Sequence, residues 1–439
     1  MRIRPHALAI PLLWLLLFLP DLLLPAKAAA IGLKALIAAS LTLTALLAFW
    51  LEAPMIASLA ALFARVIPAI FLATRNVLPE IYVLDENSYR AMAQAMELDP
   101  SLLWDRSVPF FPKISWIINS LFSHPLYGEK VITALAGTLA VILAWAFLKK
   151  LVPTLPQWGI WLIALNPSLI FWSSMHLKDT FLTTLAALSL LILSSSHSRK
   201  ARWQGLAITV ISLAAAMAMF PIRNYWCLAL AGAICAGALA WALEERPCDE
   251  EARGSGWKII NLTVPAILVI ALVAGLFLMT RFLRPAQFEN VHNNMCHYSQ
   301  SPINPDITFA TWKNFFLYLP RGGAAFLFSP YPWETPRTGF HLLSQIESGI
   351  YIILLPLGFM TMLRRGFRNW DPGTTALITF IGIILFMHSF MEGNVGTSVR
   401  HRIIILIFLL PLAAEPIKRL LNSSAEQQDS GEQHNSGKQ

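Results

Sequence analysis

The stretch VITALAGTLAVILAWAFLKK, residues 131–150, decides the fold. It carries no charge from Val131 to Leu148. A helix of this length is ~27 Å long, which is close to the ~30 Å hydrocarbon core of a bilayer. Lys149 and Lys150 follow at once, as basic residues do on the cytoplasmic side of a span. The stretch therefore predicts a transmembrane helix with a defined orientation.

Similar apolar runs fill the rest of the chain. Of its 439 residues, 56% are hydrophobic and 13% are charged, about half the charged fraction of a soluble domain. This composition excludes a soluble or disordered protein, and continuous runs exclude a membrane β-barrel, whose strands alternate over ~10 residues. We expect an all-α, polytopic helix bundle with about twelve spans. They lie near 7–24, 30–50, 55–73, 129–148, 155–174, 177–195, 204–220, 225–243, 258–279, 346–363, 374–391 and 402–417.

Basic clusters in short loops orient the bundle. Five of them fall on one side of the predicted membrane, together with both termini, and that side is expected to be the cytoplasm. The expected location is a bacterial inner membrane. Residues 1–420 would form one integral membrane domain with outer loops near 74–128 and 280–345, and 421–439 a disordered cytoplasmic tail. Segments 108–123 and 311–329 are expected to be interfacial pieces in these loops. The clusters are Arg2/Arg4, Lys149/Lys150, Arg199/Lys200/Arg202, Arg364/Arg365/Arg368 and Lys418/Arg419.

The remaining polar residues gather on the opposite, outer face. Five short patches share it, whereas chance would scatter them over both faces. This common side predicts one site at the outer membrane boundary. The patches are Asp85-Glu86-x-x-Tyr89, His176-x-Lys178-Asp179, Arg223-Asn224-Tyr225, Pro330-Tyr-Pro-Trp-Glu334, and Glu392-Gly-Asn394 with Arg400-His401-Arg402.

Asp85 and Glu86 precede a stretch that suits a short amphipathic helix over 87–96. The carboxylates would then lie at its N-terminus, where the dipole favours negative charge. One interpretation is a helix cap on a solvated loop. The other is a general base near lipid, which takes a proton from an acceptor hydroxyl. The same pair is the candidate for a divalent metal, although two adjacent carboxylates alone are weak evidence.

Charged residues at other outer span ends suit an anion. Lys178 and His176 would contact a phosphate while Asp179 orients them; alternatively, Lys178 snorkels and Asp179 caps the next helix. Arg223, Arg400 and Arg402 are basic residues on the disfavoured side, and a guanidinium binds phosphate oxygens bidentately. The alternative is structural pairing with Glu392 or another carboxylate. The candidate substrate-binding set also includes Tyr89, Tyr225, Glu392 and His401.

Several chemistries lack their motifs. The sequence has no Walker A loop, GxSxG, HExxH, or GxGxxG opening a helix after a strand, so ATP hydrolysis, serine hydrolysis and nicotinamide chemistry have no support. The net charge of +8 comes without a basic block interleaved with aromatics. It is what anionic lipids and membrane orientation require, and no nucleic acid partner is expected.

The order of these patches resembles that of the polytopic GT-C glycosyltransferases, which include bacterial relatives of protein mannosyltransferases and lipid A aminoarabinose transferases. The resemblance rests on the acidic pair in the first long outer loop, on Asn166-Pro-Ser-Leu-Ile-Phe-Trp-Ser-Ser ending in Lys178-Asp179, and on the late Arg400-His-Arg402. Three spans precede the acidic loop, where many family members have one.

The resemblance implies transfer of a sugar from a polyprenyl-phosphate donor to a lipid or glycan acceptor on the outer face. Asp85 would be the base, and Glu86 would support it or bind a metal. Lys178, Arg223, Arg400 and Arg402 would hold the lipid phosphate as it leaves. Two alternatives remain: a polymerase of the O-antigen or exopolysaccharide type, and a lipid-linked saccharide transporter or flippase.

Overall fold

The structure is a computed structural model of the chain. It describes residues 27–75, 77–78, 80–122, 125–195, 202–243, 284–297, 299, 301–305, 307–336, 338–368 and 371–423. The expected spans 7–24 and 258–279, the loop 244–257 and nearly all of the expected tail lie outside these residues.

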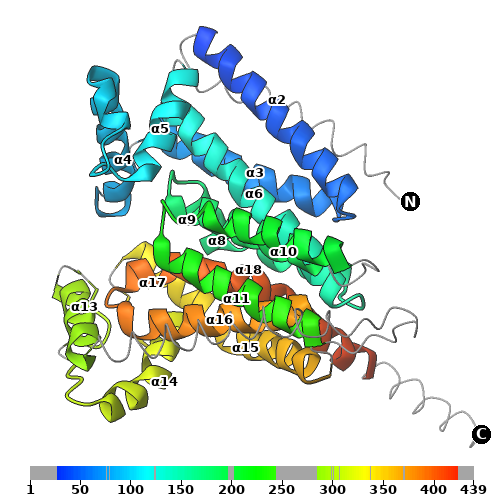
Figure 1. Cartoon of the computed structure of the whole chain (residues 1–439). Coiled ribbons are helices and arrows are strands. Elements are labelled where there is room, and N and C mark those ends of the chain that lie inside the picture. Colours follow the sequence, from blue (N-terminus) through cyan, green and yellow to red (C-terminus); the bar gives the residue numbers. More distant parts are fainter. Residues whose placement is uncertain are drawn as a thin grey trace, which may run out of the picture.

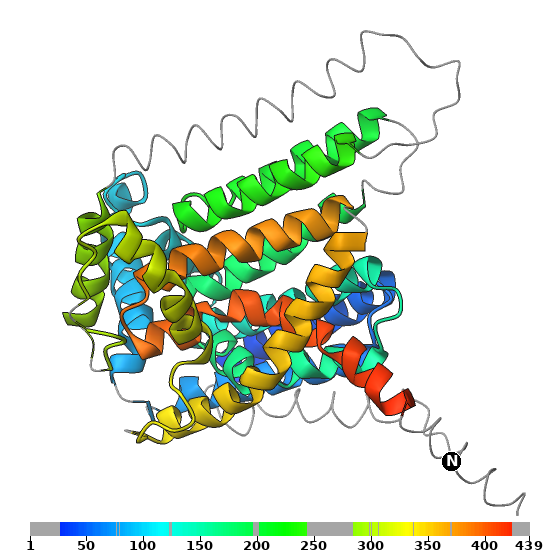
Figure 2. The same ribbon diagram turned by 90° about the horizontal axis from the view of Figure 1, so that it is seen from below.

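The described part of the chain is helical, with an isolated bridge between Pro302 and Asn394 as its one β-type pairing. The helices pack into the bundle of Figures 1 and 2, with α4 and α13 at one end and the C-terminal turns pointing to the other. The α-helices are α2 Lys27–Trp50, α3 Met55–Thr74, α4 Glu80–Leu98, α5 Phe110–Leu121, α6 Pro125–Leu151, α7 Trp161–Ala164, α8 Pro167–Ser173, α9 Lys178–Ser194, α10 Arg202–Met217, α11 Asn224–Leu243, α13 Pro285–His297, α14 Trp312–Phe328, α15 Gly339–Arg368, α16 Pro372–Met391, α17 Val395–His401 and α18 Ile403–Leu412.

Six of these helices are long and apolar enough to cross a membrane. The bent pair α8 and α9, which meet at 113°, would make a seventh if it counts as one span. The twelve spans expected from the sequence are therefore not matched among the described residues. The six are Gly32–Trp50, Met55–Thr74, Leu126–Leu151, Asn224–Trp241, Gly339–Arg365 and Pro372–Met391.

The expected span 155–174 is broken into short pieces. A turn of 3-10 helix, Gln157–Ile160, leads into α7, and α8 begins at Pro167, which cannot donate a backbone hydrogen bond. Arg65 of α3 is fully buried and donates to the carbonyls of Ile163 (3.2 Å) and Ala164 (2.9 Å). The carbonyls at a helix end need such partners, so the charge inside α3 serves the break in its neighbour.

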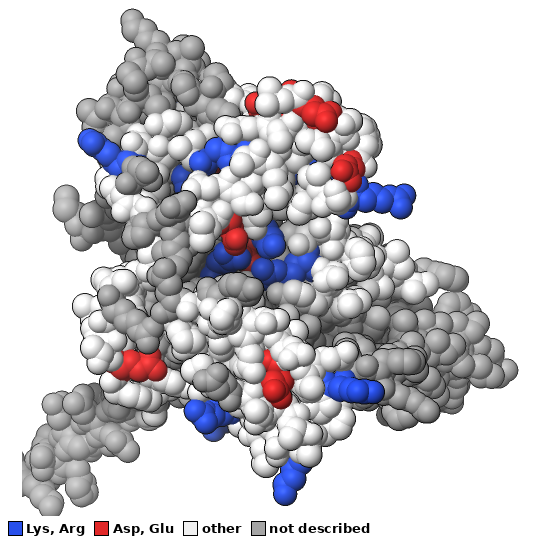
Figure 3. All heavy atoms as spheres, turned by 90° about the vertical axis from the view of Figure 1, so that its left-hand side faces the viewer, with Lys and Arg blue, Asp and Glu red and all other residues white. Residues whose placement is uncertain are grey.

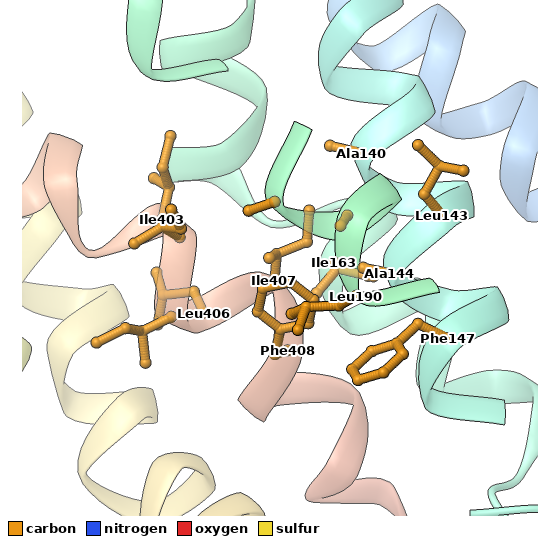
Figure 4. Close-up of a cluster of buried hydrophobic side chains, with 14 of the residues drawn as sticks. Ala140, Leu143, Ala144, Phe147, Ile163, Leu190, Ile403, Leu406, Ile407 and Phe408 are labelled. Atoms are coloured by element: carbon orange, nitrogen blue, oxygen red, sulfur yellow. The ribbon is translucent and has the colours of Figure 1, made fainter. Parts of the chain in front are cut away.

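The last apolar run is a core helix. Every residue of α18 is buried, as expected for a helix that is hydrophobic all round. Figure 4 shows its side chains, among them Ile407 and Phe408, against Phe147 of α6 and Leu190 of α9. Gly358 of α15 lies so close to the Leu409 carbonyl that a Cβ there would collide with it.

The acidic pair lies inside a helix. The expected helix 87–96 is instead α4, which begins at Glu80, so the predicted place of Asp85 and Glu86 at a helix N-terminus is wrong. Of the four apolar residues expected on one face of this helix, Tyr89, Ala93 and Met96 are buried, whereas Met92 is 37% exposed. The segments 108–123 and 311–329 contain the helices α5 and α14, and α14 continues through Pro320.

Candidate functional site

Helix α4 presents two different faces to the bundle. Consecutive residues of an α-helix point ~100° apart, so Asp85 and Glu86 diverge. Asp85 faces Arg400 of α17, with 2.6 Å between Oδ2 and Nη1. Glu86 is buried and faces Lys130 of α6 at 2.8 Å. The two neighbouring carboxylates therefore belong to two separate clusters.

The first, which we call the Asp179 cluster, consists of Asp85, Lys178, Asp179, Arg223 and Arg400. Asp179 is 1% exposed and receives two guanidinium groups. Its Oδ1 lies 2.9 Å from Arg223 Nη1 and its Oδ2 lies 2.7 Å from Arg400 Nε. The cluster thus joins α4, the start of α9, the turn before α11, and α17.

Asp179 is the buried carboxylate with which both arginines of this cluster pair. It lies in the first turn of α9, whose N-cap is Leu177, and its carboxylate serves the two arginines instead of capping the helix. Burial alone would lower the pKa of Arg400, but Asp179 and Asp85 outweigh burial and raise this pKa. The guanidinium therefore stays charged.

Lys178 is the cation of this cluster that no carboxylate holds. Its Nζ lies 5.9 Å from the centroid of the Tyr89 ring, a weak cation–π contact. It makes no ion pair with any residue that the structure describes. Three cations face two carboxylates, so the cluster carries a net charge of +1. Burial and the nearby Asp85 raise the pKa of Tyr89, which keeps the phenol neutral.

A buried network of two imidazoles and a carboxylate lies next to Asp179, since His401 Nε2 is 3.8 Å from Asp179 Oδ1. His388 Nδ1 and His401 Nδ1 approach Glu392 Oε1 at 2.7 and 2.5 Å. Thr397 donates to Glu392 Oε2 at 2.8 Å. Burial would raise the pKa of Glu392, but His401 and the hydrogen bonds of both imidazoles hold it well below its usual value.

These three residues are of metal-binding types, and their ligand atoms lie within 4.8 Å of one another. The Trp226 indole, however, donates to His388 Nε2 at 3.2 Å. An indole N–H only donates, so Nε2 carries a lone pair and the imidazole proton is on Nδ1. A metal at Nδ1 would move that proton to Nε2, against another donor. The donor set fits a hydrogen-bonded network better than a metal centre.

Asp85 and Glu86 do not form a metal centre either. A divalent cation needs several oxygen ligands around one point. The Asp85 carboxylate contacts Arg400, whereas the Glu86 oxygens contact Arg90 and Lys130, each at 2.8 Å. Nothing in this arrangement aims both carboxylates at the same place.

A cavity of about 200 Å³ opens beside Arg400. One wall is aromatic, with Trp172 and Phe340 in edge contact at 5.7 Å. The other carries Asn394 and Thr397. The Trp172 indole nitrogen is buried and has no hydrogen-bond partner among the described residues. The cavity therefore combines aromatic faces, polar groups and one cation.

The site lies at the α4 end of the bundle. Figure 3 looks onto this end and shows basic and acidic side chains together in a central hollow. The side chain of Asp85 is 46% exposed, whereas those of Arg400 and Arg223 are 13% and 10% exposed. The carboxylate is thus at the mouth and the guanidinium groups lie deeper.

The second cluster, which we call the Glu86 cluster, consists of Glu86, Arg90, Glu129 and Lys130. Arg90 contacts Glu86 at 2.8 Å and Glu129 at 3.5 Å. Burial would raise the pKa of Glu86, but Lys130 and Arg90 outweigh it and lower the pKa. The cluster ties α4 to α6 below the cavity end of the bundle.

His176 lies by the Glu86 cluster and makes no contact with Arg223 or Arg400 among the described residues. It is fully buried, with Nε2 2.8 Å from Ser115 Oγ and Nδ1 2.9 Å from Thr133 Oγ1. Its ring also lies 4.9 Å from the Phe111 ring. Both nitrogens are satisfied inside the protein, so His176 connects helices α5 and α6 with the turn before α9.

Arg402 also lies apart from the Asp179 cluster. It is fully buried, and its Nη1 donates to the carbonyls of Leu327 (3.1 Å) and Ser329 (2.9 Å) at the end of α14. Its guanidinium carbon lies 5.0 Å from the Tyr351 ring centroid. Like Arg65, this residue satisfies a helix end.

The other residues predicted for the site lie beside Arg223 or close to the cavity. Tyr225 lies beside Arg223, 5.5 Å from guanidinium carbon to ring centroid. In the Pro330-to-Glu334 patch the Tyr331 and Trp333 rings stack on each other at 5.0 Å, and Pro330 lines the cavity.

Sequence reasoning missed several residues that contact the buried carboxylates of Glu86 and Glu392. Glu129-Lys130 opens the apolar run of α6, and a charged pair at the head of a span was a usable signal. Arg90 follows Glu86 by four residues, the spacing of a helical ion pair. Thr397 and Trp172 gave no signal, because neither stands out among hydroxyl and aromatic residues.

Comparison with known proteins gives no relative. No family model, curated protein or solved structure matches the chain. The function must therefore be argued from the site itself.

Proposed function

We propose that the chain is a membrane glycosyltransferase that moves a sugar from a polyprenyl-phosphate-linked donor to a lipid or glycan acceptor. The observation that carries the proposal is the linked series Asp85–Arg400–Asp179–Arg223, drawn from four separate segments beside a cavity. An exposed carboxylate at the mouth, with cations held beneath it, suits the departure of a phosphate from a sugar.

The proposed reaction uses each group once. The acceptor oxygen attacks the anomeric carbon, and the bond from that carbon to the phosphate oxygen breaks. The phosphate leaves with the electron pair and is held by Lys178, Arg223 and Arg400. Asp85 takes the proton of the acceptor hydroxyl.

The ion pair between Asp85 and Arg400 then acts as a gate for the base. A carboxylate held 2.6 Å from a guanidinium is a poor proton acceptor. When Arg400 turns to a phosphate, Asp85 is released toward the acceptor. Asp179 keeps the arginine in place during this exchange, since it holds the Nε side of the same guanidinium.

The cavity suits a small polar ring. Its volume of about 200 Å³ is below the ~300 Å³ at which pockets for drug-sized ligands begin. Aromatic faces such as that of Trp172 pack on the apolar face of a sugar. The size favours one sugar over a whole repeat unit.

The test measures transfer from a labelled polyprenyl-phosphate sugar in membranes. Arg400→Gln and Asp85→Asn are each expected to lower the rate at least a hundredfold, the scale of losing one transition-state contact or a general base. Arg106→Gln is the control, because Arg106 is exposed and lies outside the cluster. Normal transfer by Asp85→Asn would remove the base assignment. Loss of polymer with single-sugar transfer intact would instead favour a polymerase.

A topology test checks the common side. Reporter fusions after Arg90, Lys178, Arg223 and Arg400 are all expected to report the outer face. A cytoplasmic signal at any one of these four positions would contradict a single outer site.

A further inference from the structure

A second and larger cavity, of about 480 Å³, lies at the other end of the bundle. Along α15 it is separated from the first cavity by the distance from Ser344 to Thr361, which is ~25 Å at ~1.5 Å per residue. Three segments far apart in the sequence line it: the turn after α6, the last part of α15, and the helical turns that follow α18 over 414–423.

The lining of this cavity is basic. It contains Arg364, Arg365 and Arg419 against one carboxylate, Glu415, so three cations face one anion and the lining carries a net charge of +2. Glu415 Oε1 is already engaged, since it accepts from Thr154 Oγ1 at 3.1 Å and from Arg419 Nη2 at 3.0 Å. The carboxylate therefore pairs with Arg419 and with neither Arg364 nor Arg365.

Arg365 lacks an acceptor where it is buried. Its Nε has no hydrogen-bond partner among the described residues. The nearest carboxylate, Asp371, is 3.8 Å away and already accepts from Thr374 N and Oγ1 at 2.9 and 2.6 Å. Arg365 therefore has one long ion pair and no hydrogen bond at Nε, and Arg364 makes no hydrogen bond or ion pair with the described part of the chain. A guanidinium cannot lose its charge, so an external anion would complete this site.

Exposed apolar side chains next to the arginines in the sequence indicate which kind of anion. Leu363 directly precedes Arg364, and Leu420 and Leu421 directly follow Arg419; they are 41%, 63% and 64% exposed. A free phosphate has no use for such neighbours, whereas the acyl chains of a phospholipid would cover them. The tendency for basic residues to face the cytoplasm explains their charge. It does not explain why three segments enclose a cavity with them.

We propose that this cavity binds the phosphate group of an anionic phospholipid headgroup. Guanidinium forks from Arg364 and Arg365 hold the phosphate oxygens, and the exposed leucines contact the chains. The site is independent of the proposed sugar transfer, because it shares no residue with the Asp179 cluster.

The experiment uses the full chain purified in a neutral maltoside detergent, and follows thermal unfolding with three probes. Short-chain phosphatidylglycerol is expected to raise the unfolding temperature with a saturable concentration dependence. Short-chain phosphatidylcholine and inorganic phosphate are expected to have much weaker effects. Equal responses to the two lipids would overturn the proposal, and so would an inorganic phosphate response as strong as that of phosphatidylglycerol.

The variants locate the site. The double variant R364Q/R365Q is expected to bind phosphatidylglycerol at least tenfold more weakly, while Arg106→Gln binds it as the parent does. R364K/R365K keeps the charges and the fold but loses the bidentate fork, and is expected to bind several-fold more weakly. It decides the matter if the glutamine variant does not fold. Unchanged affinity in the lysine variant would refute the role of the guanidinium forks.

Discussion

Adjacent carboxylates on α4 should have opposite effects when they are neutralised. Glu86→Gln removes the partner of Lys130, whose side chain is 3% exposed. Leaving such a buried charge unpaired costs ~3–5 kcal/mol of the free energy of unfolding. Asp85→Asn breaks a contact at a side chain that is 46% exposed, where an ion pair contributes ~0–1 kcal/mol. Arg400 also keeps its second partner, Asp179.

Two assays separate the two effects. Thermal unfolding in detergent micelles, followed by tryptophan fluorescence, should show Glu86→Gln strongly destabilised and Asp85→Asn close to the parent. Sugar transfer per folded molecule should show the reverse, with Asp85→Asn inactive and Glu86→Gln active in proportion to its folded fraction. Equal loss of stability in both variants would refute the division of α4 into two faces.

The pH dependence of stability gives an independent check on Glu86. Lys130 and Arg90 lower its pKa in the folded protein below the ~4.3 of an unfolded chain. A depressed pKa contributes stability that is present above the unfolded value and is lost as the pH falls through the folded value. The stability difference between the parent and Glu86→Gln should therefore be present at neutral pH and shrink as the buffer becomes more acidic than about pH 4. A difference that grows on acidification would contradict the sign.

Two further predictions concern packing and the imidazole network. Gly358→Ala should cost ~1–3 kcal/mol because its Cβ would collide with the Leu409 carbonyl; Gly349→Ala on the same helix, with 3.5 Å to its nearest neighbour, should be neutral in the same unfolding assay. Trp226→Phe removes the donor to His388 Nε2, so Co²⁺ absorption bands should appear on titration of this variant and be absent from the parent, and equal binding by both would contradict the assigned proton position.

The helical class was readable because lipid and protein interiors demand the same apolar runs. The number of spans was not, because a run such as Ile403–Leu412 satisfies either environment and the structure places it inside the bundle. The break near Pro167 was visible as a residue, but its effect depended on Arg65 from another helix. A hydropathy profile does not show which residues of other helices will contact a given segment.

The sequence predicted which polar residues share one side of the membrane, but it did not predict which of them contact one another. Sorting polar residues by side brought Asp85, Lys178, Arg223 and Arg400 together, and the structure places them in one cluster. The sequence placed Glu86 just before a helix, whereas α4 begins at Glu80. Glu86 therefore lies within the helix and points to a different face from Asp85. Pairing over long sequence separations, as between Asp179 and Arg400, cannot be read from local patterns.

The run Arg400-His401-Arg402 has a consequence for how substitutions would spread. Its three side chains face the Asp179 cluster, Glu392 and the end of α14, because consecutive residues point ~100° apart in the helical turn that joins α17 to α18. These three consecutive residues thus contribute, in order, to an ion pair, to the imidazole network and to hydrogen bonds with backbone carbonyls. A change at Arg402 that shifts this turn would displace Arg400 without touching it. A substitution at Arg402 is therefore expected to reduce function through a backbone displacement that moves Arg400. A second-site suppressor of such a substitution would be found at the end of α14 sooner than in the cavity.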